Sequence, residues 1–180
     1  MPDPPSRFDP SAYGPTVAAI LGDGQRLAAL GPGQPDLSVR PLLEGFDPAR
    51  GFPELRDADA GYACLAGLWL YHDFLDDSHQ ISQGLHTPEG SFWHALMHRR
   101  EPDPGNSNYW WQRVGHHPVL DQLREQAPAA GYRYTSPAEF VAFCEKCRDN
   151  GTPDEELARR VQLLEWRLLF DWCYRKAVRV

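Results

Sequence analysis

The chain has 180 residues, of which 42% are hydrophobic, and a formal net charge of −7 at pH 7. This length can bury one substantial core and is too short to favour two domains. The acidic balance argues against extensive nucleic-acid contact and against attraction to an anionic membrane surface. Because no window approaches about 18 uninterrupted apolar residues, we expect no membrane-spanning helix.

The N-terminal residues differ in composition from the rest of the chain. Residues 1–12 are rich in Pro, Asp and Ser, and they contain almost nothing to bury. We therefore expect a loose arm over 1–12 and one helical domain over 13–180. The first residues also lack the basic and apolar pattern of a targeting signal, so we expect a soluble, cytoplasmic protein.

Apolar spacing and capping residues predict a succession of helices separated by turns. Short helices are expected over 15–21, 25–30 and 39–46, followed by a loop over 47–57. A long amphipathic helix is predicted from Ala58 to about Gln80, with Asp73 and Asp77 facing solvent. The later elements are a capped helix over 87–100, a turn-rich segment over 102–115 that ends in aromatic residues, a short helix after Pro118, and capped helices over 136–150 and 153–176.

No alternating apolar and polar run is long enough to predict a strand, and no internal repeat is visible. The sequence therefore predicts an all-α fold, an irregular single-domain helical bundle with long loops. Among the four cysteines, Cys144 and Cys147 form a C-x-x-C within a helical pattern, without a second pair at zinc-site spacing. We expect buried, reduced thiols; the alternative, metal or redox use, requires an exposed thiol.

All seven histidines fall in the middle third of the chain. His94 and His98 lie one turn apart on one helix face, a spacing that lets two imidazoles reach one metal ion. The glutamate of a His-Glu-x-x-His peptidase is missing. In the preceding predicted helix, His72, Asp76 and His79 lie at i, i+4 and i+7, which places them on one face.

Antiparallel packing of these two helices would join the imidazoles and the carboxylate in one site. The candidate ligands are His72, Asp76, His79, His94 and His98. Such a nitrogen and oxygen site suits a divalent transition metal, namely Zn, Fe, Mn or Ni, and it could activate water. The alternative is that each histidine is hydrogen-bonded separately to a carboxylate or a backbone carbonyl, because a buried imidazole needs a polar partner.

One basic and aromatic patch follows the second histidine pair. Its candidate ligand-binding residues are Arg99, Arg100, Trp110, Trp111 and Arg113. Guanidinium groups beside flat rings suit a phosphate, a carboxylate or a stacked base. The alternative is that the arginines pair with acids such as Glu101 or Asp103 while the tryptophans fill the core.

A resemblance is carried by three stretches. They are Asp76-Asp77-Ser78-His79-Gln80-Ile81, the run from Thr87-Pro88-Glu89-Gly90-Ser91-Phe92-Trp93-His94 through Met97-His98-Arg99-Arg100-Glu101-Pro102-Asp103, and residues 106–115. Over roughly residues 76–117, the chain resembles a set of uncharacterised small bacterial and fungal hypothetical proteins of unknown function. The resemblance implies a small globular protein and no particular activity, cofactor or catalytic residue.

These observations lead to one expected function and two alternatives. We expect a metal-dependent enzyme, a hydrolase or an oxygen-using enzyme, that acts on a small molecule, with arginines to orient an anionic substrate. The first alternative is a non-enzymatic binding module that holds a peptide, nucleotide or partner protein with the Arg/Trp/Tyr patch, the histidines being structural. It predicts Trp110 or Trp111 exposed beside Arg113. The second alternative is a purely structural or regulatory helical protein.

Overall fold

The computed structural model describes residues 8–178, which form ten α-helices and two short 3-10 helices and include no strand. The elements are η1 (Pro10–Tyr13), α1 (Pro15–Leu21), α2 (Arg40–Gly45), α3 (Pro48–Gly51), α4 (Ala58–Tyr71), α5 (Leu75–Gly84), α6 (Pro88–Arg100), α7 (Pro104–Val114), α8 (Pro118–Gln126), η2 (Ala127–Ala130), α9 (Pro137–Cys147) and α10 (Pro153–Val178). The predicted all-α, single-domain bundle is confirmed. Within the described range, no helix is both long and apolar enough to cross a membrane.

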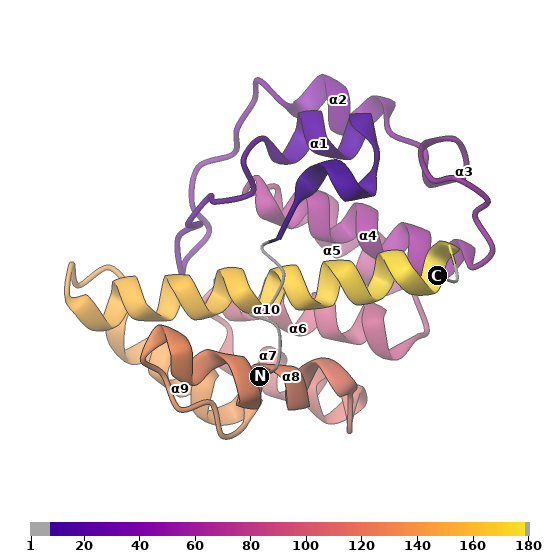
Figure 1. Ribbon diagram of the computed structural model, residues 1–180. Helices are drawn as coiled ribbons and strands as arrows, with labels where there is room; N and C mark the ends of the chain where they lie inside the picture. Colours follow the sequence, from indigo (N-terminus) through magenta and orange to yellow (C-terminus); the bar gives the residue numbers. More distant parts are fainter. Residues whose placement is uncertain (1–7, 179–180) are drawn as a thin grey trace, which may run out of the picture.

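The longest helix, α10, runs through the middle of the molecule. Helices α1 to α3 lie on one side of it and α7 to α9 on the other (Figure 1). Helix α10 packs against α4, α8 and α9, while α4, α5, α6 and α7 pack in succession. Its buried face includes Trp166 and Phe170, whose rings stack with centroids 4.9 Å apart. The core therefore surrounds α10.

Side-chain caps mark several helix starts. The Thr87 hydroxyl accepts the Gly90 N–H at the start of α6, and the Ser136 hydroxyl accepts the Glu139 N–H at the start of α9. Each cap satisfies one of the first-turn N–H groups that have no partner within the helix. The helix starts predicted from these residues are confirmed.

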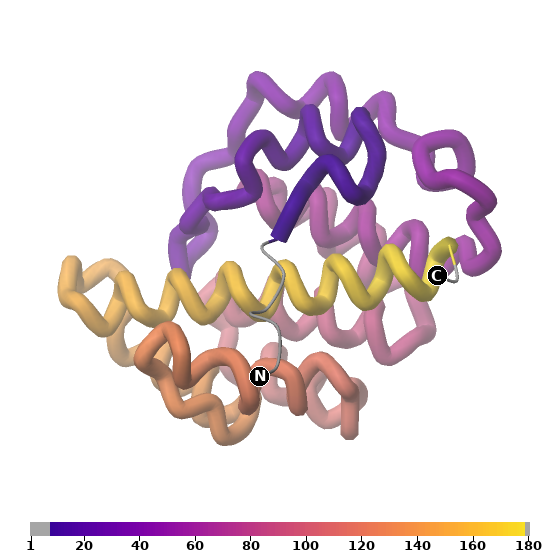
Figure 2. The backbone as a smooth tube through the Cα atoms, viewed as in Figure 1, coloured from indigo at the N-terminus to yellow at the C-terminus, as the bar shows by residue number. Residues whose placement is uncertain are grey.

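The segment between α1 and α2 is not helical, so the helix predicted over 25–30 is wrong. Its carbonyl groups accept hydrogen bonds from α10: Arg159 binds the Ala28 oxygen at 3.1 Å and Gln162 binds the Ala29 oxygen at 3.1 Å. The segment is thus held against α10 by side-chain bonds to its carbonyl groups, not by bonds within a helix of its own. Figure 2 shows the segment descending from α1 to the first half of α10.

The helix predicted over 58–80 is broken into α4 and α5 at residues 72–74. Asp73 has a left-handed φ of 66°, and the Phe74 N–H bonds to the Trp69 oxygen at 3.1 Å. This is a Schellman-type helix end, in which a glycine usually takes the left-handed position. The break turns α5 away from the direction of α4, so the face predicted for one straight helix does not exist.

Interactions distant in sequence hold Asp73 at that position. The carboxylate of Asp73 is buried, is 2.6 Å from the Arg26 guanidinium, and forms a second ion pair with Arg100. It also accepts the Gln34 N–H at 3.3 Å. The prediction that Asp73 faces solvent is therefore wrong, because two arginines draw it inward.

Residues 1–7 of the expected arm lie outside the described residues. The last part of that arm is packed: Phe8 and Tyr13 have ring centroids 5.4 Å apart, and the Tyr13 ring meets Phe170 edge-on at 5.0 Å. All four cysteines are buried and free, as expected. Burial raises the pKa of the Cys144 thiol to about 12, which suits a structural thiol.

Candidate metal centre

Helices α5 and α6 pack as an antiparallel pair and bring three histidines together. His79 comes from α5, and His94 and His98 come from successive turns of α6. One ring nitrogen of each lies within 4.8 Å of the others. The ring centroids are 4.6 Å apart for His79 and His94, 4.8 Å for His94 and His98, and 5.5 Å for His79 and His98. We call these three residues the histidine triad, and its geometry could hold a metal ion.

Ser82 fixes the ring nitrogen that His94 presents. The buried Ser82 hydroxyl donates to the His79 backbone oxygen at 3.3 Å and lies 3.3 Å from His94 Nδ1. Because the hydroxyl has one proton, we assign the second bond as His94 Nδ1–H donating to Ser82. His94 Nε2 then carries the lone pair, which is the form that binds a metal.

Glu101 fixes the ring nitrogen that His98 presents. Nδ1 of His98 lies 2.9 Å from Glu101 Oε2, one helical turn away. A carboxylate that accepts Nδ1–H leaves Nε2 as the free lone pair and increases its basicity. Two members of the triad are therefore oriented by partners on the side away from the proposed ion.

Burial keeps His94 neutral. Its side chain is 2% exposed, and burial together with the neighbouring rings of His79 and His98 lowers the pKa of His94 to about 3. At neutral pH the imidazole is therefore uncharged, as ligation requires. Three imidazoles this close cannot all be protonated without mutual repulsion.

An aromatic and arginine surface borders the triad. The Trp110 ring stacks on His94 with centroids 3.9 Å apart and planes 28° apart. The Arg113 guanidinium lies 5.3 Å from the centre of the same tryptophan ring, and Tyr109 beside it is 52% exposed. Trp110 is partly buried and Arg113 is exposed, so this surface connects the triad with solvent.

Two predicted ligands lie elsewhere. His72 is buried at the end of α4, where Nε2 hydrogen-bonds the Ile20 oxygen at 2.8 Å. Asp76 is exposed and lines a cavity of about 580 Å³ together with Glu101 and other acidic residues. The helix break at residues 72–74 explains the position of His72, which ends α4, whereas Asp76 remains on α5 with His79 but is exposed to solvent.

Three residues of the predicted patch are also placed away from the surface. Arg99 is fully buried and pairs with Glu165 at 2.6 Å, and Arg100 is buried and pairs with Asp73. Trp111 is buried against Phe92, with ring centroids 4.6 Å apart. Adjacent residues on α7 point about 100° apart, which sends Trp110 and Trp111 to different neighbours.

Sequence reasoning did not identify Ser82 or Glu101. Glu101 follows His98 by three residues, a spacing that places two side chains on one helix face. This contact could therefore have been predicted from the sequence. No sequence pattern predicts the contact of Ser82 with His94, since it depends on how α5 packs on α6.

Comparisons with protein-family models, with curated proteins and with solved structures find no match for this chain.

Proposed function

We propose that the protein is a metal-dependent hydrolase whose divalent ion is held by His79, His94 and His98. One observation carries the proposal: three ring nitrogens from two helices lie within 4.8 Å of one another, and two of the rings are oriented by Ser82 and Glu101. Three imidazoles without a carboxylate favour Zn, Fe or Ni over Mn, which prefers oxygen ligands.

The triad needs only a small closure to hold an ion. With metal–nitrogen bonds of about 2.0–2.1 Å, tetrahedral ligands stand about 3.3 Å apart. Nitrogens now within 4.8 Å of one another can reach that separation by rotation of side chains. His79 is only partly buried and is the ring best placed to adjust.

Three protein ligands leave at least one coordination position for water. A divalent ion bound in this way lowers the pKa of that water towards 7 and so supplies hydroxide at neutral pH. The cavity of about 580 Å³ that Glu101 lines lies on the Nδ1 side of His98, and none of the three histidines lines it. That cavity is lined by several carboxylates and by Arg40, whereas Arg113 lies beside Trp110, on the side of the triad where it could orient an anionic group.

The binding-module alternative expects an exposed tryptophan beside Arg113; Trp110 is partly buried, with the Arg113 guanidinium 5.3 Å from its ring centre. Because the same Trp110 ring stacks on His94, we assign both residues to the entrance of the metal site. In this proposal the surface formed by Trp110 and Arg113 binds the small molecule that the metal site hydrolyses.

The test is to remove metal with a chelator and then restore Zn²⁺, Fe²⁺ or Ni²⁺ separately. Hydrolysis of nitrophenyl acetate and nitrophenyl phosphate, and oxygen uptake, are measured for each form. We expect ester hydrolysis that depends on metal, that is lost in His98→Ala, and that is retained in His116→Ala, whose side chain is exposed outside the triad. Hydrolysis that survives in metal-free protein would contradict the proposal, and oxygen uptake without hydrolysis would replace hydrolase by oxygen-using enzyme.

A further inference from the structure

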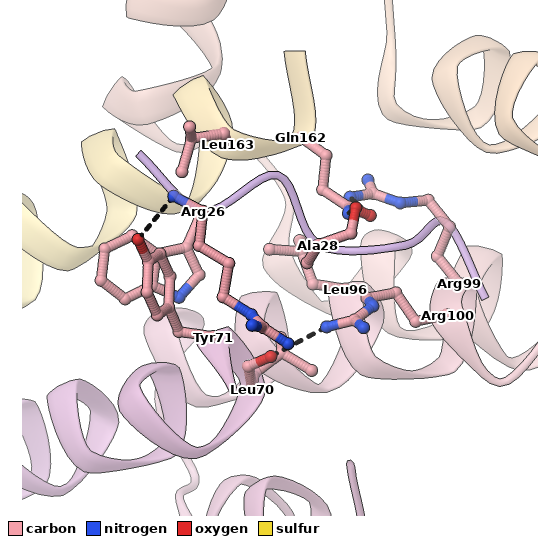
Figure 3. A pocket seen from close by; sticks show the side chains of 10 residues that line it. Arg26, Ala28, Leu70, Tyr71, Leu96, Arg99, Arg100, Gln162 and Leu163 are labelled. Atoms are coloured by element: carbon pink, nitrogen blue, oxygen red, sulfur yellow. Dashed lines mark hydrogen bonds between the residues drawn. The ribbon is translucent and has the colours of Figure 1, made fainter. Parts of the chain in front are cut away.

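A second, smaller cavity lies between α4, α6, α10 and the segment between α1 and α2. The volume open to the centres of water molecules is about 20 Å³. Its polar lining consists of Arg26, Tyr71, Arg99, Arg100 and Gln162 (Figure 3). A volume of this size holds one water molecule or one small ion.

The charges around this cavity do not balance. Arg99 pairs with Glu165 at 2.6 Å, whereas Arg26 and Arg100 both pair with the single carboxylate of Asp73. Three guanidinium groups thus face two carboxylates, which leaves one positive charge in excess. Burial lowers the pKa of Arg100, Asp73 raises it, and the charges of Arg99 and Arg26 lower it further, as expected for crowded cations.

The same arginines have hydrogen-bond donors that are not used. Arg99 is fully buried, and within the described part of the chain its Nε and Nη1 atoms have no hydrogen-bond partner. Nε of Arg26 is likewise buried and unpartnered there. A buried donor on a charged group without an acceptor is costly, so an acceptor is expected beside them.

Tyr71 adds a further donor. Its hydroxyl oxygen accepts the Arg26 backbone N–H at 2.9 Å, which leaves the hydroxyl proton free to donate. The remaining lining is apolar and includes Leu96, Leu163 and Trp166. A cavity with several donors, an excess positive charge and apolar walls suits a weakly hydrated anion better than a cation.

We propose that this cavity binds one small monovalent anion, of the size of chloride, beside the guanidinium groups of Arg26 and Arg99. A water molecule could accept the donors, but it would not neutralise the excess charge, which solvent at the partly exposed Arg26 screens only in part. Arg26 belongs to the segment between α1 and α2, whereas Arg99 and Tyr71 belong to α6 and α4. The anion therefore fastens this segment to the core, and its binding stabilises the folded state.

The first test is crystallographic. Crystals of the wild-type protein grown in bromide are measured at the bromine absorption edge. We expect one anomalous peak in the cavity beside the Arg99 guanidinium. A non-anomalous water at that position, or no density, would overturn the proposal. This test needs no variant and does not depend on the metal centre.

The second test measures stability in chelator-treated protein. Bromide replaces gluconate, which is too large for the cavity, at a constant ionic strength of roughly 0.2 M. The midpoint of thermal unfolding should rise by roughly 2–6 °C. Arg26→Met removes the excess charge, and because Arg26 is partly exposed the variant should fold. Its midpoint should not respond to bromide.

Arg40→Met is the matched control, because Arg40 is partly exposed, pairs with Glu44 at 2.8 Å and lies outside this cavity. It should keep the wild-type response. A wild-type midpoint that is the same in bromide and gluconate would overturn the proposal, as would a full response in Arg26→Met.

Discussion

His98 and Glu101 lie one turn apart at the end of α6, with Nδ1 of the imidazole 2.9 Å from Oε2 of the carboxylate. With Nδ1–H assigned as the donor to this carboxylate, Nε2 is the ring nitrogen left to bind a metal. Glu101 itself is exposed and lines the larger cavity, so it contacts both solvent and a member of the triad.

Replacing that carboxylate should weaken metal binding without removing a ligand. In Glu101→Gln we expect an affinity for Zn²⁺ lower by about 10–100-fold, because the amide accepts the Nδ1–H more weakly. Competition with a chromogenic chelator measures the change. Glu156→Gln, an exposed carboxylate on α10 paired with Arg160, should bind like the wild type. Equal affinities for both variants would show that Glu101 does not act on His98.

The stacking of Trp110 on His94 offers an optical readout of the site. Cu²⁺ or Ni²⁺ held by the triad should quench the fluorescence of the Trp110 ring, whose centroid is 3.9 Å from that of His94. Trp110→Phe should lose most of the quenching. Zn²⁺, which has a filled d shell, is the control ion and should leave the emission nearly unchanged. Undiminished quenching by Cu²⁺ in Trp110→Phe would place the ion elsewhere.

Gly33 should be intolerant of any side chain. Its φ is +72°, and a Cβ there would lie 2.6 Å from Asp73 Cγ, in the buried carboxylate that ends α4. We expect Gly33→Ala to lower the free energy of unfolding by about 1–3 kcal/mol, from the left-handed backbone and the displaced ion pairs. Urea denaturation measures it.

The matched control is Gly45→Ala in α2, where a Cβ would meet nothing within 4 Å. That change should be neutral or stabilise by up to about 1 kcal/mol, since alanine restricts the unfolded chain. Equal effects of the two substitutions would contradict the role given to the close approach between Gly33 and Asp73.

Glu89 should govern part of the acid sensitivity of the fold. Burial alone would raise the pKa of Glu89, but the nearby His117 ring, 3.8 Å away, and hydrogen bonds from Trp172 and Lys176 outweigh it and hold the pKa well below 4.5. Between the two pKa values the unfolded chain binds more protons than the folded one, so stability falls as pH drops below 4.5.

Glu89→Gln cannot titrate. It should cost about 1–3 kcal/mol near neutral pH, where the buried carboxylate loses its charge and its ion pair with the partly exposed Lys176. Its free energy of unfolding should fall less steeply than that of the wild type below pH 4.5. Urea denaturation at several pH values gives the free energy of unfolding of both proteins. If it falls equally steeply below pH 4.5 in the wild type and in Glu89→Gln, Glu89 does not contribute to the acid sensitivity.

Local signals in the sequence predicted much of the fold. Capping residues such as Thr87 and Ser136 mark real helix starts, because a cap acts within three residues of itself. The spacing of His94 and His98 likewise placed two of the three triad residues, because side chains four residues apart share one helix face. The break at Asp73 could not be predicted, since it depends on Arg26 and Arg100, which are 47 and 27 residues away.

The burial of charged side chains could not be predicted from the sequence either. Arg99 follows His98 directly in the sequence, yet it points into the core because Glu165, 66 residues away, receives it there. The segment over 25–30 has helical spacing, but its carbonyl groups bind side chains of α10. In each case a tertiary partner outweighed a local preference, and single-sequence periodicity contains no information about that partner.

The most direct test of the metal centre is the metal content of protein purified without an affinity tag and then incubated with Zn²⁺, Fe²⁺ or Ni²⁺. We expect about one equivalent of a transition metal in the wild type and in His116→Ala, and less than about a tenth in His79→Ala and His94→Ala. Circular dichroism should show all four proteins to be equally helical. Less than about a tenth of an equivalent in the wild type, or undiminished content in the triad variants, would contradict the proposed site.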